Sequence, residues 1–134
     1  MAALKYSKQR ESIKQFLQSR TDHPTADTIY LNIRETFPNI SLGTVYRNLS
    51  LLTELGEVVK ITTDGGADHF DGITTPHHHF ICTRCHSVSD LRYMENIDYI
   101  LDAAQKAAPG EVQSYVAHFY GICEECQKKN EKTS

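Results

Sequence analysis

The sequence predicts an α+β protein, with an N-terminal winged helix-turn-helix domain in residues 1–70 and a C-terminal α/β dimerisation domain in residues 76–134. Three observations support this prediction. Helical apolar patterns followed by a hairpin pattern fill the first half, the composition changes after Gly72 at an expected hinge (71–75), and two Cys-x-x-Cys pairs lie in the second half. A chain of 134 residues can bury one ordinary core or two small ones.

Apolar residues at helical spacing predict three helices in the first half. Ser7 can cap the first, in which Ile13, Phe16 and Leu17 recur at i, i+3 and i+4. The second is expected to start at 23–25, with proline in its first turn, and to end before Pro38. The third is expected to open at Ser41 and to stop at Gly56. The stripes of the last two helices are Ile29, Ile33 and Phe37, and Leu42, Val45, Leu49 and Leu52.

A β-hairpin is expected after the third helix, because residues 58–62 and 67–71 flank the turn Asp64-Gly65-Gly66. Three helices and a hairpin follow the order of a winged helix-turn-helix, whose third helix lies in the DNA major groove. The exposed side of that helix offers groups that suit phosphates and base edges, namely Thr44, Tyr46, Arg47, Asn48 and Ser50. The alternative is an ordinary solvated helix face.

The formal net charge of −3 conceals an uneven distribution. Residues 1–20 carry five basic residues and one acidic residue, whereas residues 71–134 carry six basic and nine acidic residues. A basic arm on an otherwise acidic chain indicates a polyanionic partner at one end, with Lys8 and Arg10 as candidate DNA contacts. No signal peptide is visible, and no run approaches the roughly 18 apolar residues of a membrane span. We therefore expect a cytoplasmic protein with no membrane partner.

The second half is expected to contain short strands at 80–82 and 88–91, one helix, and a long β-favouring run over 112–122. Residues 128–134 have the composition of a polar tail. The helical stripe ends at Pro109-Gly110 and consists of Ile97, Ile100, Leu101, Ala104 and Ala108. These apolar residues are too few for an independent core, so we expect pairing with a second copy. A homodimer is also what a palindromic DNA operator requires.

The cysteines form two pairs with the same spacing, Cys82-x-x-Cys85 and Cys123-x-x-Cys126. Four thiolates fill the tetrahedral sphere of Zn²⁺ and leave no position for a substrate, so this pattern predicts one structural zinc per subunit. Two disulfides, or a redox Cys-x-x-Cys, are the alternatives. Thiols stay reduced in the cytosol, which favours zinc.

Histidines and aspartates form a second candidate metal site. His77 and His79 can share one face of a strand while His78 points away, and Asp71 and Asp90 lie nearby in the sequence. Folding back of the winged-helix domain could add His23. A set of nitrogen and oxygen ligands without sulfur suits Fe²⁺ or Mn²⁺. Because His23 comes from the first half and the other histidines from the second, metal binding there would fix the angle between the halves.

Four motifs occur in order along nearly the whole chain: HPTAD at 23–27, TVYRNL at 44–49, HHHFICTRC at 77–85 and YGICEEC at 120–126. Together they resemble the ferric uptake regulator family. The resemblance implies an N-terminal winged helix, a hinge and a C-terminal domain whose sheet pairs across a dimer. It also implies that the four cysteines hold structural zinc.

Within that family the chain is most similar to the peroxide-responsive repressors. The resemblance implies a regulatory Fe²⁺ or Mn²⁺ site, one per subunit, formed by His23, Asp71, His77, His79 and Asp90. Iron-uptake regulators usually have glutamate where this chain has the two aspartates. With Fe²⁺, H₂O₂ would oxidise His23 or His77 and release the operator DNA, whereas Mn²⁺ would leave the repressor bound. An iron- or manganese-availability regulator of the same family, without an oxidation step, is the alternative.

The reaction with H₂O₂ alters the protein itself, so no enzyme and no other small-molecule substrate are predicted. A metalloenzyme with a facial triad is the hypothesis from another class, but five candidate ligands leave little open coordination. A zinc-held interaction module without DNA is a third reading.

The chain departs from the family pattern in several places. An N-terminal segment of many members has no counterpart, and Lys5, Lys8 and Arg10 are expected to replace it. The additional metal site of some iron-type members is not expected, because Pro76 and Tyr115 stand where histidines would be. His69, His86 and His118 lie outside the pattern and are interpreted as surface residues, with His69 as a candidate auxiliary ligand.

Overall fold

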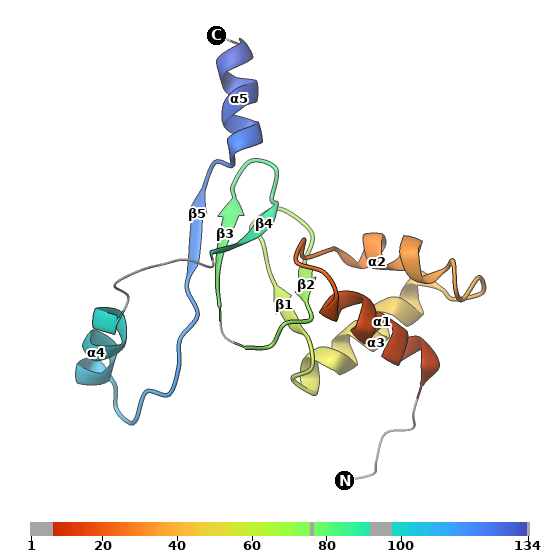
Figure 1. Ribbon diagram of the computed structural model, residues 1–134, viewed down its shortest axis with the longest axis horizontal. Helices are drawn as coiled ribbons and strands as arrows, with labels where there is room; N and C mark the ends of the chain where they lie inside the picture. Colours follow the sequence, from red (N-terminus) through yellow and green to blue (C-terminus); the bar gives the residue numbers. More distant parts are fainter. Residues whose placement is uncertain (1–6, 76, 92–97, 134) are drawn as a thin grey trace. The chain divides into compact units, whose positions relative to one another are not determined.

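The computed structural model describes residues 7–75, 77–91 and 98–133 (Figure 1). Lys5, Pro76 and Ile97, to which the sequence analysis gave roles, lie outside the described residues. The chain divides into two compact units, residues 1–74 and residues 75–134. Within the described ranges, no helix has both the length and the apolar composition that crossing a bilayer requires.

The first unit contains three helices and a two-stranded sheet (Figure 1). Its elements are α1 (Lys8–Gln18), α2 (Ala26–Ile33), α3 (Leu42–Glu54), β1 (Val59–Ile61) and β2 (His69–Asp71). A hydroxyl caps each helix by accepting a hydrogen bond from a backbone N–H in the first turn. The pairs are Ser7 with Arg10 at 3.2 Å, Thr25 with Thr28 at 3.4 Å, and Ser41 with Thr44 at 3.1 Å. The predicted order of three helices and a hairpin is confirmed.

One hydrophobic core holds the first unit together. Its largest fully buried side chains include Ile13, Leu17, Ile29, Leu49 and Leu52, which come from all three helices. Burying each such side chain contributes about 1.5–3 kcal/mol, so this cluster is the main source of the unit's stability. The stripes predicted at helical spacing supply most of its members.

The second helix differs from the prediction at both ends. It starts at Ala26 with Thr25 as its cap, so Pro24 precedes the helix and does not lie in its first turn. His23 has φ +51°, in the left-handed region, which a right-handed helix cannot include. The helix also ends at Ile33, and Phe37 packs half-buried against the core from the following turn.

The hairpin strands are shorter than the predicted runs. β1 and β2 are antiparallel, with Val59 opposite Asp71 and Ile61 opposite His69. Gly65 supplies the positive φ (+81°) that the turn needs. Thr63 closes the turn from its side chain, because its Oγ1 donates to the carbonyl oxygen of Ala67 at 3.1 Å.

The second unit contains a three-stranded sheet of order β4-β3-β5. Its elements are β3 (His78–Cys82), β4 (Val88–Leu91), α4 (Asp98–Ala107), β5 (His118–Gly121) and α5 (Glu124–Thr133) (Figure 1). β3 pairs antiparallel with β4 and parallel with β5. The parallel pair aligns the carboxyl ends of β3 and β5.

Two predictions for the second unit were wrong. The expected run over 112–122 forms a strand only at His118–Gly121, and residues 112–117 have no regular structure. Residues 124–133, interpreted partly as a polar tail, form helix α5. This helix is polar almost all round, so the periodicity that reveals a helix against a core is missing from its sequence.

The sheet of the second unit leaves apolar side chains exposed. Val116, Phe119 and Tyr120 are 53%, 41% and 60% accessible, respectively. In the described part of this unit the buried apolar residues are Ile81, Cys82, Val88 and Cys126. A core this small fits the expectation that the second half is not self-sufficient.

Candidate metal centres

The four cysteines meet at the end of the sheet in the second unit. Cys82 is the last residue of β3, and it is aligned with Gly121 at the end of β5. Cys85 follows in the turn after β3, while Cys123 precedes α5 and Cys126 lies in its first turn. The parallel pairing of β3 with β5 therefore joins two cysteine pairs that are about forty residues apart in the sequence.

The spacing of the sulfur atoms fits zinc and excludes disulfides. Sγ of Cys82 lies 3.8 Å from that of Cys126, and Sγ of Cys85 lies 3.7 Å from that of Cys123. All four sulfur atoms are within 4.8 Å of one another, and all four cysteines are free. Thiolates bound 2.3 Å from a tetrahedral ion are about 3.8 Å apart, whereas a disulfide requires about 2.05 Å. The cluster has the donor set and the geometry of a structural zinc site.

The protein backbone prepares one of these thiols for a cation. Sγ of Cys82 accepts hydrogen bonds from the backbone N–H groups of Cys85, Arg84 and Cys123, each at 3.4 Å. These donors, that of Cys85 foremost, lower the pKa of Cys82 to about 5. Burial instead raises the pKa of Cys126 to about 12. A bound cation provides the charge that lets a buried sulfur exist as thiolate.

A histidine and an aspartate form a buried pair in the first unit. Nε2 of His23, in the loop between α1 and α2, lies 3.2 Å from Oδ2 of Asp71 at the end of β2. Both side chains are 1% exposed. Asp71 is fixed by its other oxygen, Oδ1, which accepts from the backbone N–H of Ile73 at 2.9 Å. We call this pair the first half-site.

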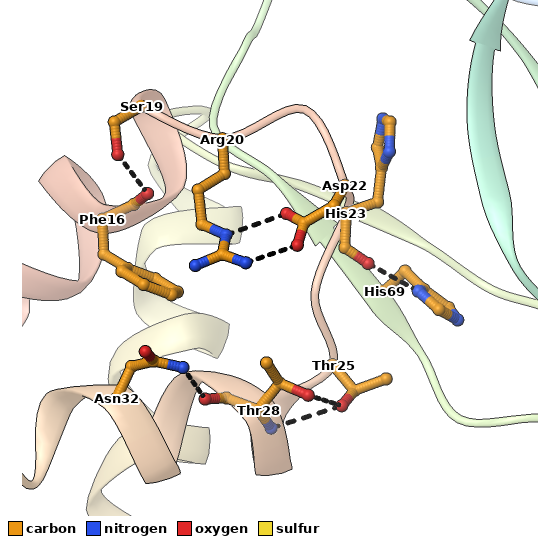
Figure 2. Close-up of polar contacts among 9 residues, drawn as sticks. All are labelled: Phe16, Ser19, Arg20, Asp22, His23, Thr25, Thr28, Asn32 and His69. Carbon is orange, nitrogen blue, oxygen red and sulfur yellow. Dashed lines mark hydrogen bonds and ion pairs between the residues drawn. The ribbon is translucent and has the colours of Figure 1, made fainter.

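The loop that carries His23 is tightly fastened, as Figure 2 shows. Arg20 donates from Nε to Asp22 at 2.9 Å, and its guanidinium lies 4.7 Å from the centre of the Phe16 ring. The hydrogen bonds from Arg20 lower the pKa of Asp22 below its usual range. His69 reaches the same loop, with Nδ1 2.6 Å from the backbone oxygen of His23. His23 itself lies in the left-handed region, with φ +51°, and this conformation costs a non-glycine residue of order 1 kcal/mol.

Two histidines and an aspartate gather in the second unit. His79 on β3 lies directly opposite Asp90 on β4, and His77 immediately precedes β3. Oδ1 of Asp90 is 3.2 Å from Nε2 of His77 and 3.7 Å from Nε2 of His79. His77 bonds the oxygen of Thr75 through Nδ1 at 2.8 Å, so Nδ1 carries the proton and Nε2 faces Asp90. We call this trio the second half-site.

Both half-sites have the chemistry of a transition-metal site without sulfur. Ligand atoms held about 2.1 Å from one ion are about 3.0–3.5 Å apart, close to the separations within each half-site. Imidazole and carboxylate together suit Fe²⁺, Mn²⁺ or Zn²⁺. Neither half-site alone supplies the four to six ligands that such ions take.

The neighbouring histidine, His78, has a different environment. Its Nδ1 accepts a hydrogen bond from the backbone N–H of Ala117 at 3.0 Å, and its ring stacks on Tyr115 with the ring centres 4.8 Å apart. The alternation of a β-strand accounts for this difference, since adjacent residues point to opposite faces. The stacking partner, Tyr115, stands where some iron-type members have a histidine of their additional metal site. The ring of His78 therefore contacts an aromatic side chain at that position.

The three remaining histidines do not form one group. His118 is largely exposed, and its ring lies 5.2 Å from that of His79. Burial of part of the side chain is the main cause that lowers the pKa of His118, and the charge of His79 is the second. His86 follows the first cysteine turn with φ +64°. His69 is partly buried, like His86, and its Nδ1 bonds to the loop of His23, a contact that the sequence analysis did not predict. Its position two residues before Asp71, on the same strand face, was the available signal.

The polar face of α3 is accessible, as a DNA-reading helix requires. Val45, Leu49 and Leu52 are buried on the opposite side, whereas Tyr46 is 48% exposed and Arg47 is exposed. The guanidinium of Arg47 donates to Oγ1 of Thr44 at 3.0 Å, and Asn48 lies half-buried beside them. At the start of α1, Lys8 is exposed and Arg10 is half-buried.

The model of the "Ferric uptake regulator family" matches residues 1–115. The chain belongs to the ferric uptake regulator family. Peroxide-responsive repressor PerR of Staphylococcus aureus is 36% identical over 128 residues, which cover 96% of this chain and 86% of that protein. The PerR protein of Staphylococcus epidermidis is 34% identical and is covered to 85%.

Solved structures of this family resemble most of the chain. The Campylobacter jejuni peroxide stress regulator superposes with a TM-score of 0.76 at 31% identity, covering 88% of each chain. The Helicobacter pylori ferric uptake regulator Fur, described with three functional metal binding sites, superposes with a TM-score of 0.79 at 26% identity. It covers 92% of this chain and 83% of that one. These matches confirm the α+β class with an N-terminal winged helix and a C-terminal dimerisation domain.

Members of the ferric uptake regulator family are DNA-binding transcriptional regulators that act as dimers, and they are not enzymes. The chain therefore belongs to a class of metal-responsive regulators. Its four-cysteine cluster and its histidine and aspartate half-sites are the corresponding candidate metal centres.

Proposed function

We propose that this protein is a homodimeric, metal-dependent transcriptional repressor that senses hydrogen peroxide through Fe²⁺-catalysed oxidation of a ligand histidine. It would act in the cytoplasm, where thiols stay reduced and the cysteine cluster can hold zinc. The observation that carries the proposal is the set of two half-sites, one in each unit, which contain only imidazole and aspartate. Identity of 34–36% with peroxide-responsive repressors over 96% of the chain supports the same function.

The two half-sites are proposed to share one ion. His23 and Asp71 provide two ligands, and His77, His79 and Asp90 provide three, which together complete a five-coordinate sphere. Asp71 and His77 are six residues apart, so the chain allows their Cα atoms to be separated by no more than about 21 Å. A short tether gives the second half-site a high effective concentration near the first. Binding of one ion by both groups then fixes the angle between the units.

DNA binding is proposed to follow from that angle. Two copies of α3 must reach successive major grooves about 34 Å apart on a palindromic operator. The candidate contacts are Thr44, Tyr46, Arg47 and Asn48 on α3, with Lys8 and Arg10 near the start of α1. A metal ion that holds the two units of each subunit in one arrangement raises the fraction of dimers whose two α3 helices have the spacing of the DNA grooves. Metal binding then strengthens DNA binding, and DNA binding strengthens metal binding by the same factor.

Zinc in the cysteine cluster has a separate, structural part in this proposal. Four thiolates complete its sphere, so the ion stays inert and holds α5 and β5 against β3. Val116, Phe119 and Tyr120, exposed along and beside β5, are the proposed contact surface with a second subunit.

The peroxide response depends on how the aspartates hold the ion. An aspartate arm is shorter than the glutamate that iron-uptake regulators usually have at these positions, and a changed ligand arrangement leaves room for peroxide. Fe²⁺ supplies the electrons that activate H₂O₂ when it is bound here. In the net reaction, one oxygen atom of H₂O₂ becomes bound to C2 of His23 or His77, the C2 hydrogen ends on the second ring nitrogen to give the 2-oxo imidazole, and the other oxygen leaves as water with both hydrogens of H₂O₂. An oxidised ligand binds metal more weakly, which releases the operator.

Mass spectrometry of the metal-loaded dimer tests the proposal. The Fe²⁺-loaded and the Mn²⁺-loaded protein are each treated with substoichiometric H₂O₂ and digested. We expect a gain of one oxygen atom on the peptide with His23 or His77 only in the Fe²⁺ sample, together with loss of operator binding. An Fe²⁺-loaded protein that stays unmodified and DNA-bound would overturn peroxide sensing and favour a regulator of iron or manganese availability.

A gel shift on a palindromic A/T-rich duplex, with and without Mn²⁺, tests the DNA-binding part. We expect Mn²⁺ to be required and binding to weaken steeply with salt, because each neutralised phosphate releases counterions. Absence of binding under both conditions would support the reading as a zinc-held module without DNA.

A further inference from the structure

His69 connects the β-hairpin to the loop that carries the first metal ligand. Its ring nitrogen Nδ1 lies 2.6 Å from the backbone oxygen of His23, a residue 46 positions earlier in the sequence. Figure 2 shows the imidazole of His69 directed at that carbonyl group, at the turn between Asp22 and Thr25.

The contact fixes the protonation of one ring nitrogen. A carbonyl oxygen only accepts hydrogen bonds, so Nδ1 of His69 must carry the proton. That nitrogen is therefore occupied and is not available to a metal ion. The same bond lets His69 act on the backbone of His23, and it leaves Nε2 as the one ring nitrogen of His69 that is open to a metal ion.

Two backbone contacts accompany the side-chain bond. The N–H of Phe70 donates to the oxygen of Pro24 at 3.0 Å, and Thr25 forms an isolated bridge with His69. Strand β2 therefore holds residues 23–25 along its length. The same strand ends in Asp71, whose carboxylate lies 3.2 Å from the imidazole of His23.

The backbone of His23 needs such a restraint. Its φ of +51° lies in the left-handed region, which residues other than glycine uncommonly adopt even though histidine does so more often than most, and the proline that follows restricts the backbone further. In the absence of the bond to its carbonyl group, relaxation of this residue would turn the imidazole away from Asp71. Since β2 carries both the carboxylate and the restraint, the geometry of the first half-site is set within one short element.

We propose that His69 is a positioning residue for the regulatory metal site, holding the backbone of His23 so that its imidazole is directed at the ion. This inference rests on the proposed function, in which His23 is a ligand. Partners that orient metal ligands typically change metal affinity by about 10- to 100-fold when they are removed. Partners of this type usually hydrogen-bond the ring of a ligand histidine, whereas His69 binds the backbone of the ligand residue.

Three variants of the full-length, zinc-loaded dimer test the proposal by calorimetric titration with Mn²⁺. His69→Ala removes the donor, and His69→Asn replaces it, because the asparagine amide nitrogen occupies nearly the place of Nδ1. Thr63→Val is the matched control, since it removes another side-chain donor to a backbone carbonyl in the same hairpin without contacting His23. We expect His69→Ala to weaken Mn²⁺ binding about 10-fold or more, and both other variants to stay within about threefold of the unaltered protein.

A double-mutant cycle with His23→Ala separates the possible failures. If His69 acts through His23, then His69→Ala has no further effect on Mn²⁺ affinity when His23 is already alanine. Equal weakening by Thr63→Val and His69→Ala, or failure of asparagine to restore affinity, would overturn the positioning role. Unchanged Mn²⁺ affinity in His23→Ala alone would overturn the proposed ligand set, whatever His69 does. Nitrogen NMR of the metal-free dimer adds a direct readout, with His69 expected in the Nδ1–H tautomer and the opposite tautomer contradicting the contact.

Discussion

Gly72 packs directly on the backbone of Leu17. A Cβ atom at Gly72 would lie 2.6 Å from the carbonyl carbon of Leu17 and 2.6 Å from the nitrogen of Gln18, so no side chain fits there. Gly72 follows Asp71, which means that the end of β2 is seated against the end of α1 by a backbone-to-backbone contact. The carboxylate of the first half-site depends on this contact for its position.

Gly72→Ala should therefore separate β2 from α1 and disturb Asp71. The added methyl group meets backbone atoms that cannot rotate away, and overpacking of this kind costs about 1–3 kcal/mol. Urea denaturation should show the loss, and Mn²⁺ binding should weaken. Gly110→Ala is the control, because a Cβ there meets nothing within 4 Å, and it should be neutral within about 0.5 kcal/mol. Equal behaviour of the two variants would contradict the argument.

Loss of one cysteine should remove the zinc and with it the dimer. Cys82→Ser takes away the fully buried thiol that accepts three backbone hydrogen bonds, and structural zinc contributes on the order of 10 kcal/mol to folding. Metal analysis should fall from one zinc to none per chain, and size-exclusion chromatography should show that the dimer is lost. Cys123→Ser is expected to behave in the same way. A zinc-free variant that still elutes as a folded dimer would show that the cluster is dispensable.

Asp90→Ala should impair the second half-site and leave the cysteine cluster intact. Its carboxylate serves His77 and His79 in the second half-site but does not belong to the cysteine cluster. We expect the variant to keep one zinc per chain and its dimeric state, and to lose Mn²⁺-dependent DNA affinity in a gel shift. His77→Ala is expected to give the same result. If Asp90→Ala instead unfolds the protein, the assignment of this trio to regulation is wrong.

Arg47→Ala should weaken binding to the operator by about 1–3 kcal/mol if the guanidinium holds a base. Its present partner, Oγ1 of Thr44, is an exposed contact that DNA can replace. Arg47→Lys separates the two roles of the side chain, because lysine keeps the charge and loses the bidentate fork. Lys106→Ala, on the last turn of α4, removes a positive charge from the other unit as a control. Equal losses for Arg47→Ala and Lys106→Ala in a fluorescence-anisotropy titration would mean that Arg47 contributes only to net charge.

Local chemistry accounts for the elements that the sequence predicts well. Ser7 was predicted as a helix cap and Ser41 as the opening residue of a helix, and both accept a hydrogen bond from a backbone N–H in the first turn. Capping uses neighbouring residues, and the apolar stripes of α1 and α3 reflect a helix period that any core imposes. These features depend on a few consecutive residues, so the sequence is sufficient to find them.

Other elements depend on contacts that the sequence does not display. The start of α2 shifted to Ala26 because β2 holds residues 23–25 in an extended, partly left-handed path. Residues 112–116 have strand composition but no partner strand among the described residues, and α5 has no apolar stripe because its anchor is the cysteine cluster. In each case tertiary contacts override a local preference of less than about 1 kcal/mol per residue.

The sequence by itself determined which chemistry is present: two thiol pairs for zinc, and histidines with aspartates for a second ion, because ligand types are a property of residues and their spacing. Only the tertiary structure decided which of these groups meet. It joined Cys82 to Cys126 through the parallel pairing of β3 with β5, turned His78 toward Tyr115, and brought His69 to the backbone of His23. The physical reason is that strand register and chain reversals set distances between residues that lie far apart in the sequence, and no local propensity encodes them.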